Sequence, residues 1–102
     1  MQHIGILLEN EQGDKIKSSN LNFADVLVWL FGIKEYQIKY PWLSTIDPYG
    51  NTVLNSLQVP LIINELKIFS LEVDEETKKT IELVISFLQD TDQHHYIKLF
   101  GD

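Results

Sequence analysis

Two stretches at opposite ends of the chain constrain its fold most, because each alternates between apolar and polar positions. Residues 4–8 carry isoleucine or leucine at every second position, and residues 95–100 repeat this pattern with Ile97 and Leu99. A repeat of two residues is the period of a β-strand. A strand needs a hydrogen-bonded neighbour, and the first strand is the natural one for the last. We therefore expect a sheet in which these two strands lie side by side.

The stretch after the first strand predicts a β-hairpin. Gly13 and Asp14 are residues that favour a turn, and residues 15–17 alternate again. Leu7 gives the first strand an apolar side chain on the face opposite Ile6. Apolar contacts on both faces indicate that the first strand lies in the middle of the sheet.

The next segment predicts a helix. Residues 23–30 have helical apolar spacing, either Asn20 or Asn22 can cap the start, and Gly32 is a suitable stop. Trp29 lies off the apolar stripe, so it either widens the buried face or contacts the central segment of the chain. Residues 36–40 alternate, which predicts an edge strand or an extended connection.

Two further helices follow in the second half of the chain. One is expected to begin at Pro60, whose missing N–H costs nothing in the first turn, and to end near residues 70–71. The other is expected to begin after the N-cap Asp74 and to end near residues 89–92. Acidic residues 75 and 76 suit the positive end of that helix.

These elements predict one domain, residues 1–102, of the α+β class. We expect a small antiparallel sheet, made of the N-terminal hairpin and the C-terminal strand, with about three helices packed on one face. A chain of 102 residues buries roughly 65% of its unfolded surface, enough for one core. The predicted core contains Ile4, Ile6, Leu8, Val26, Leu27, Leu30, Ile62, Ile63, Leu66, Phe69, Ile81, Val84, Ile85, Leu88, Ile97 and Leu99.

The charge of the chain bears on its partners. The net charge is −7, from 15 acidic residues against 8 lysines and arginines. This balance argues against binding to nucleic acid or to an anionic membrane surface, because both need cationic side chains. It suits solubility and a basic protein partner. Cysteine is absent and no segment has the length and apolar character of a membrane span, so we expect a cytoplasmic protein.

The irregular segment 40–58 holds the candidate binding residues: Trp42, Asp47, Tyr49 and Asn51. Asp47 opens an Asp-Pro-Tyr-Gly turn in which its carboxylate accepts backbone N–H groups and Gly50 takes the exit conformation. The favoured interpretation of Asp47 is this turn, ahead of a catalytic acid. Trp42 and Tyr49 line a pocket, anchor a partner or simply pack on the core.

No residue set predicts catalysis, a metal or a cofactor. His94 and His95 are adjacent, so on a strand they point to opposite faces, and His3 alone does not complete a zinc site. The chain has no glycine-rich phosphate loop, and its serines and threonines have no general base at an informative spacing. We therefore predict that the protein is not an enzyme.

Two motifs of this chain carry a family resemblance. The first is Ile-Asp-Pro-Tyr-Gly at 46–50, followed by Thr52, and the second is Tyr-x-Lys-x-x-Gly-Asp at 96–102. Together they resemble motifs in a family of small uncharacterised bacterial proteins of about this length. Asn51 and Leu54 stand where that family often has Asp and Phe.

The resemblance covers roughly the last two thirds of the chain, and the opening hairpin more loosely. It implies a fold, with two helices and a closing strand after the first motif, but no activity. Small proteins of this kind occur among mobile gene cassettes and as candidate immunity proteins that neutralise toxins.

Two functions of different classes are consistent with these observations. The leading hypothesis is a non-enzymatic protein-interaction module, immunity-like or self-associating, whose partner is another protein or a second copy in a homodimer. The alternative is a small-molecule-binding protein or minor enzyme with a pocket at Trp42 to Asn51.

Overall fold

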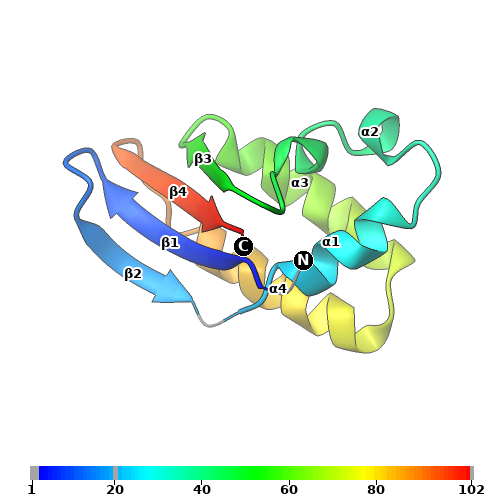
Figure 1. The fold of residues 1–102 in the computed structure, drawn as a ribbon. Helices are drawn as coiled ribbons and strands as arrows, with labels where there is room; N and C mark the ends of the chain where they lie inside the picture. The colour runs from blue at the N-terminus through cyan, green and yellow to red at the C-terminus, as the bar shows by residue number, and fades with distance from the viewer. Residues whose placement is uncertain (1–2, 20, 102) are drawn as a thin grey trace.

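The strands nearest the two ends of the chain form the centre of a four-stranded antiparallel sheet (Figure 1). β1 (Gly5–Asn10) pairs with β4 (His95–Phe100), as predicted. β2 (Lys15–Ser19) lies beyond β1 and β3 (Asn51–Asn55) lies beyond β4, which gives the order β2-β1-β4-β3. This computed structural model describes residues 3–19 and 21–101, so the predicted cap Asn20 lies outside the described residues.

The strand register places alternate side chains on a covered and an open face of the sheet. Ile6 lies opposite Leu99, and Leu8 lies opposite Ile97. All four side chains are buried against the helices. On the other face, Val53 is 56% exposed. The α+β arrangement with helices on one face is confirmed, and α3 and α4 run behind the sheet in Figure 1.

β3 corrects the interpretation of segment 40–58 as irregular throughout. Residues 51–55 pair antiparallel with β4, with Leu54 opposite Ile97. β3 is an edge strand, and Leu54 is its one buried residue. A strand with a single buried side chain shows no hydrophobic alternation, which is why the sequence pattern does not reveal it.

The first helix, α1 (Ala24–Phe31), forms where it was predicted, but its ends differ from the expectation. Phe23 is the N-cap residue and makes no capping bond through its side chain. The Asn22 carboxamide oxygen instead accepts hydrogen bonds from the N–H groups of Ala24 and Ile4, each at 3.0 Å. Asn22 therefore joins the start of α1 to the start of the first strand. Gly32 follows the last helical residue in a right-handed conformation, with φ at −79°.

The prediction of an edge strand or an extended connection at residues 36–40 is wrong. Residues 36–39 form a single helical turn, α2 (Tyr36–Lys39), and the N–H of Tyr40 donates to the carbonyl of Tyr36 at 2.7 Å. Tyr36 and Tyr40 are four residues apart, so they fit a helical period as well as an alternating one. Glu35 reverses the chain just before this turn, with φ at 60°.

Glu35→Gly is expected to stabilise the protein modestly. The left-handed conformation of Glu35 costs a residue with a Cβ about 1–2 kcal/mol, and glycine adopts it freely. The greater entropy of glycine in the unfolded chain offsets part of this, so we expect a gain of about 0.5 kcal/mol in the free energy of unfolding. Urea denaturation measures it. Glu35→Ala, which retains the Cβ, serves as the control and should show no gain.

Two longer helices complete the fold. α3 (Val59–Phe69) begins one residue before Pro60, and the 3₁₀ turn η2 (Ser70–Glu72) continues it. α4 (Glu75–Leu88) has the predicted N-cap, because the Asp74 carboxylate accepts the N–H of Thr77 at 2.9 Å. Hydrogen bonds from Thr77 lower the pKa of the Asp74 carboxyl group.

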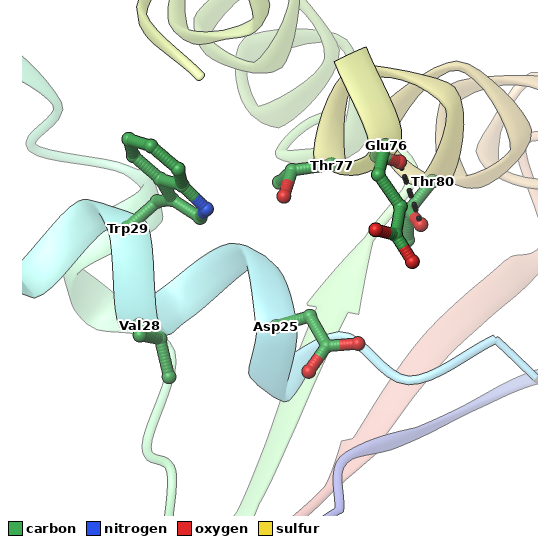
Figure 2. A pocket seen from close by; sticks show the side chains of 6 residues that line it. All are labelled: Asp25, Val28, Trp29, Glu76, Thr77 and Thr80. Atoms are coloured by element: carbon green, nitrogen blue, oxygen red, sulfur yellow. Dashed lines mark hydrogen bonds between the residues drawn. The ribbon is translucent and has the colours of Figure 1, made fainter. Parts of the chain in front are cut away.

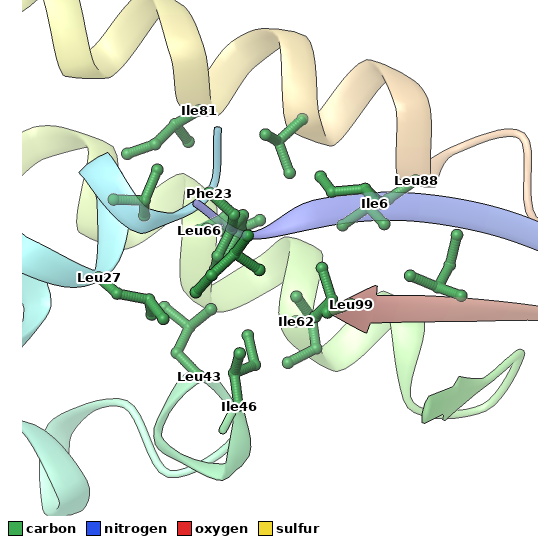
Figure 3. Packing of buried hydrophobic residues seen from close by; sticks show 14 of the residues in the cluster. Ile6, Phe23, Leu27, Leu43, Ile46, Ile62, Leu66, Ile81, Leu88 and Leu99 are labelled. Atoms are coloured by element: carbon green, nitrogen blue, oxygen red, sulfur yellow. The ribbon is translucent and has the colours of Figure 1, made fainter. Parts of the chain in front are cut away.

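The core lies between the covered face of the sheet and the helices (Figure 3). All the predicted core residues are buried, except that Ile63 and Ile85 are partly buried at its edge. The structure adds residues that the predicted core did not include: Phe23, Ala24, Tyr40, Leu43, Ile46, Leu54 and Val59. Four of these, Tyr40, Leu43, Ile46 and Leu54, come from the segment 40–58, so that segment helps to form the core.

Candidate functional site

The predicted turn at Asp47 is present in the structure. The N–H of Tyr49 donates to the Asp47 carboxylate at 2.9 Å, and the N–H of Asp47 donates to the Thr52 hydroxyl at 2.9 Å. Gly50 does not have the positive φ expected of the exit residue of the turn. Among the described glycines, a positive φ occurs at Gly13. A Cβ on Gly50 would instead lie 2.7 Å from an Asp47 carboxylate oxygen. The glycine therefore leaves room for the Asp47 side chain.

The two motifs that carry the family resemblance meet in space. The N–H of Gly101 donates to the carbonyl of Gly50 at 2.7 Å. A Cβ on Gly101 would lie 2.5 Å from the carbonyl carbon of Pro48, and closer still to its oxygen. Gly101 therefore lets the chain after β4 pack directly on the backbone of the Asp47 turn. This contact gives both motifs a structural role.

The four predicted binding residues fall into two places. Asp47 and Tyr49 lie in one exposed turn, and Asn51 begins β3 directly after it; the Tyr49 side chain is 70% exposed. Trp42 precedes the 3₁₀ turn η1 (Leu43–Thr45), where its N–H donates to the Glu65 carboxylate of α3. The binding role of these four residues stays a prediction.

A hollow of about 320 Å³ lies elsewhere, between α1 and α4 (Figure 2). Six residues line it: Asp25, Val28, Trp29, Glu76, Thr77 and Thr80. Helical spacing places Asp25 and Trp29 on one side of α1, because they are four residues apart. Figure 2 shows the Asp25 and Glu76 carboxylates on the same side of the hollow, with the Trp29 indole at its other end.

A second hollow of about 420 Å³ shares Val28 and Trp29 with the first and extends toward the end of α1. Its other lining residues are Gly32, Ile33 and Glu72. The two hollows adjoin at Val28 and Trp29 on α1, and we call them together the Trp29 groove. Val28 is 60% exposed and Trp29 is 40% exposed, so the middle of the groove is open and apolar.

The carboxylate in the second hollow is already engaged. Glu72 accepts hydrogen bonds from the Lys39 ammonium group and from the Tyr40 hydroxyl, and it forms an ion pair with Lys39. The bond from Lys39, followed by the bond from Tyr40, lowers the pKa of Glu72. Burial, followed by the bond to Glu72, raises the pKa of Tyr40 above its usual range. The Tyr40 ring is buried against Phe69, with 5.2 Å between ring centroids.

This arrangement predicts an acid-dependent loss of stability. A carboxyl group whose pKa is lowered by folding contributes stability above its unfolded pKa and loses that contribution as pH falls through its folded pKa. The wild type should therefore have a larger free energy of unfolding than Glu72→Gln at pH 7. This difference should disappear as pH falls below about 4.5, the ordinary pKa of a glutamate side chain. Urea denaturation across this range measures the difference. Glu82→Gln, at an exposed position, is the control. A difference in stability between the wild type and Glu72→Gln that does not change with pH would contradict the prediction.

The first hollow has a different electrostatic character. Within residues 3–19 and 21–101, the ion pairs are Lys17 with Asp90, Lys39 with Glu72, and His94 with Glu11. None involves Asp25 or Glu76, so the described structure leaves both carboxylates without a cationic partner.

Sequence patterns alone do not identify this hollow. They assign Glu76 to the helix macrodipole, and they do not select Asp25 or Trp29 as binding residues. The position of Trp29 off the apolar stripe is the sequence signal that points toward the groove.

The described residues include no group of three or more His, Cys, Asp or Glu side chains placed to hold a metal ion. No helix in that part of the chain is both long enough and apolar enough to cross a membrane.

Comparison with protein-family models, with curated proteins and with solved structures finds no match to this chain. The fold, the charge and the surface of the molecule are therefore the guides to its function.

Proposed function

We propose that this chain is a non-enzymatic protein-interaction module that binds its partner through the Trp29 groove. One observation carries the proposal: Trp29 and Val28 lie together on the surface between two hollows. A large aromatic side chain in an open apolar groove is the usual anchor of a protein interface. Each hollow is also at the small end of the range for ligand pockets, about 300–1,000 Å³.

The charge of the molecule supports a protein partner. With a net charge of −7, the chain attracts a basic surface at long range and repels nucleic acid and anionic lipid. The proposal includes a cytoplasmic location and a bacterial gene cassette as the source. The role is either immunity-like, with another protein as the partner, or self-association as a homodimer.

The small-molecule alternative concerns a different part of the surface. It requires a pocket at Trp42 to Asn51, whereas the two hollows of the Trp29 groove lie along α1. The Asp47 carboxylate is used by the turn, because it accepts the N–H of Tyr49. These observations favour the Trp29 groove over the alternative.

The two tryptophans provide a matched test. Trp29 and Trp42 have similar exposure, 40% and 36%, but of the two only Trp29 lines the hollows of the groove. We expect Trp29→Ala to abolish capture of a partner by the full chain in a pull-down from the source cells, and Trp42→Ala to retain it. Light scattering on the same variants distinguishes a second copy, because Trp29→Ala would then convert a dimer into a monomer.

The reverse result has a clear meaning. If Trp42→Ala loses the partner and Trp29→Ala retains it, binding occurs at the segment 40–58 and our proposal is wrong. Circular dichroism must show that both variants remain folded.

A further inference from the structure

We infer that the two halves of the Trp29 groove recognise different side chains of one partner protein. The half between Asp25 and Glu76 accepts a lysine or arginine, and the half at Gly32 and Ile33 accepts an aliphatic side chain. This inference rests on the proposed function and specifies the partner that the groove fits.

The first half of the groove has the features that a basic side chain requires. Asp25 on α1 and Glu76 on α4 lie on the same side of the hollow (Figure 2). No ion pair among the described residues engages either carboxylate. Opposite them, the Trp29 indole offers an aromatic ring, and tryptophan is the aromatic residue that attracts cations most strongly. A cation placed here would lie between the two carboxylates and the Trp29 side chain.

The second half lacks this preference although it also contains a glutamate. Glu72 already binds Lys39 and Tyr40, so its charge is compensated from within the chain. The remaining lining consists of Val28, Trp29, Gly32 and Ile33, which have no ionisable side chain. The absence of a side chain at Gly32 leaves its backbone open to contact. This half of the groove therefore favours an apolar group over a charged one.

The separation of the two halves sets the spacing in the partner. Asp25 and Gly32 are seven residues apart, which corresponds to about 10 Å along a helix axis. A basic and an aliphatic side chain at about that distance are about seven positions apart on a helix. On an extended strand they are about two or four positions apart, because only even spacings place both side chains on one face. The partner segment is therefore short, basic and amphipathic. Its positive charge matches the net charge of −7 on this chain.

A displayed library of random short peptides tests this inference with the full-length chain as bait. The baits are the wild type, the double variant Asp25→Asn/Glu76→Gln, the single variant Glu76→Lys, the variant Trp29→Ala and the control Glu82→Gln. Glu82 is exposed on α4 and does not line either hollow, so its neutralisation removes a charge without changing the groove.

We expect the wild type and Glu82→Gln to enrich peptides that carry lysine or arginine at the stated spacing from an aliphatic residue. The double variant should bind these peptides about tenfold more weakly, as the loss of two partly exposed charge contacts implies. Glu76→Lys should shift the selected peptides toward acidic residues. Fluorescence of Trp29, measured in a Trp42→Phe background, gives the affinities.

The possible failures are distinguishable. Equal enrichment of basic peptides by the wild type and the double variant would overturn the cation site, while loss of selection in Trp29→Ala would still support binding at the groove. If Trp29→Ala selects the same peptides as the wild type, or if the wild type selects none, the groove is not a protein-binding site. In that case the proposed function fails together with this inference.

Discussion

Leu66→Ala is expected to lower the free energy of unfolding by about 2–5 kcal/mol, the range found when a fully buried leucine is truncated. Leu66 is 0% exposed and packs at the centre of the core from α3 (Figure 3). The truncation removes the transfer free energy of the lost methyl groups and leaves a cavity that close-packed neighbours fill only in part. For a domain with a total stability of about 5–15 kcal/mol, such a loss is a large fraction.

The same helix supplies the control for this variant. Ile68, two residues away, is 57% exposed, so Ile68→Ala should change the stability by less than about 1 kcal/mol. Urea denaturation followed by circular dichroism measures both variants. An Ile68→Ala variant as destabilised as Leu66→Ala would show that the face of α3 that packs on the sheet is assigned incorrectly.

Gly101→Ala is expected to destabilise the protein by about 1–3 kcal/mol, the usual cost of forcing an extra carbon into a closely packed position. The new methyl group would lie 2.5 Å from the Pro48 carbonyl carbon and 3.0 Å from the Tyr49 nitrogen, and backbone atoms cannot rotate away as a side chain can. The chain after β4 must therefore move off the Asp47 turn. The hydrogen bond from Gly101 to Gly50 is then lost.

Gly32→Ala is a suitable comparison for Gly101→Ala. A Cβ on Gly32 would lie 3.4 Å from its nearest atom, and the φ of −79° suits alanine. We expect this variant to be as stable as the wild type or slightly more stable. Thermal unfolding ranks the three proteins, and amide hydrogen exchange at Gly101 reports the local contact. Unchanged protection of that amide in Gly101→Ala would contradict the steric argument.

Much of the fold was predictable because its strongest patterns are local. The alternation identifies the first and last segments as strands, and the apolar side chain of Leu7 indicates the central position of β1. The cap at Asp74 was predictable for a similar reason, since it depends on a few adjacent residues. These signals depend on one element at a time, so the sequence alone is sufficient to show them.

The parts that the sequence did not reveal depend on contacts between distant residues. Tyr40 is buried because Phe69 of α3 and Glu72 of η2 contact it, and no pattern near Tyr40 indicates those contacts. The Trp29 groove forms because α1 and α4 bring Asp25 and Glu76 to one hollow, although they are 51 residues apart (76 − 25). From the sequence alone, the helix macrodipole explains Glu76 without any binding role. The shared hollow becomes evident only when α1 and α4 are placed together in the structure.

The position of β4 between β1 and β3 has a consequence for synthesis of the protein on the ribosome. β4 is translated after both of its neighbours, so the sheet remains a hairpin and a separate strand until residues 95–100 have left the exit tunnel. Before that moment, β1 and β3 each present unpaired backbone groups, the kind of edge that invites pairing with other chains. The sheet is therefore completed only after most of the domain has been synthesised. A nascent chain stalled before residue 95 is expected to be prone to aggregation.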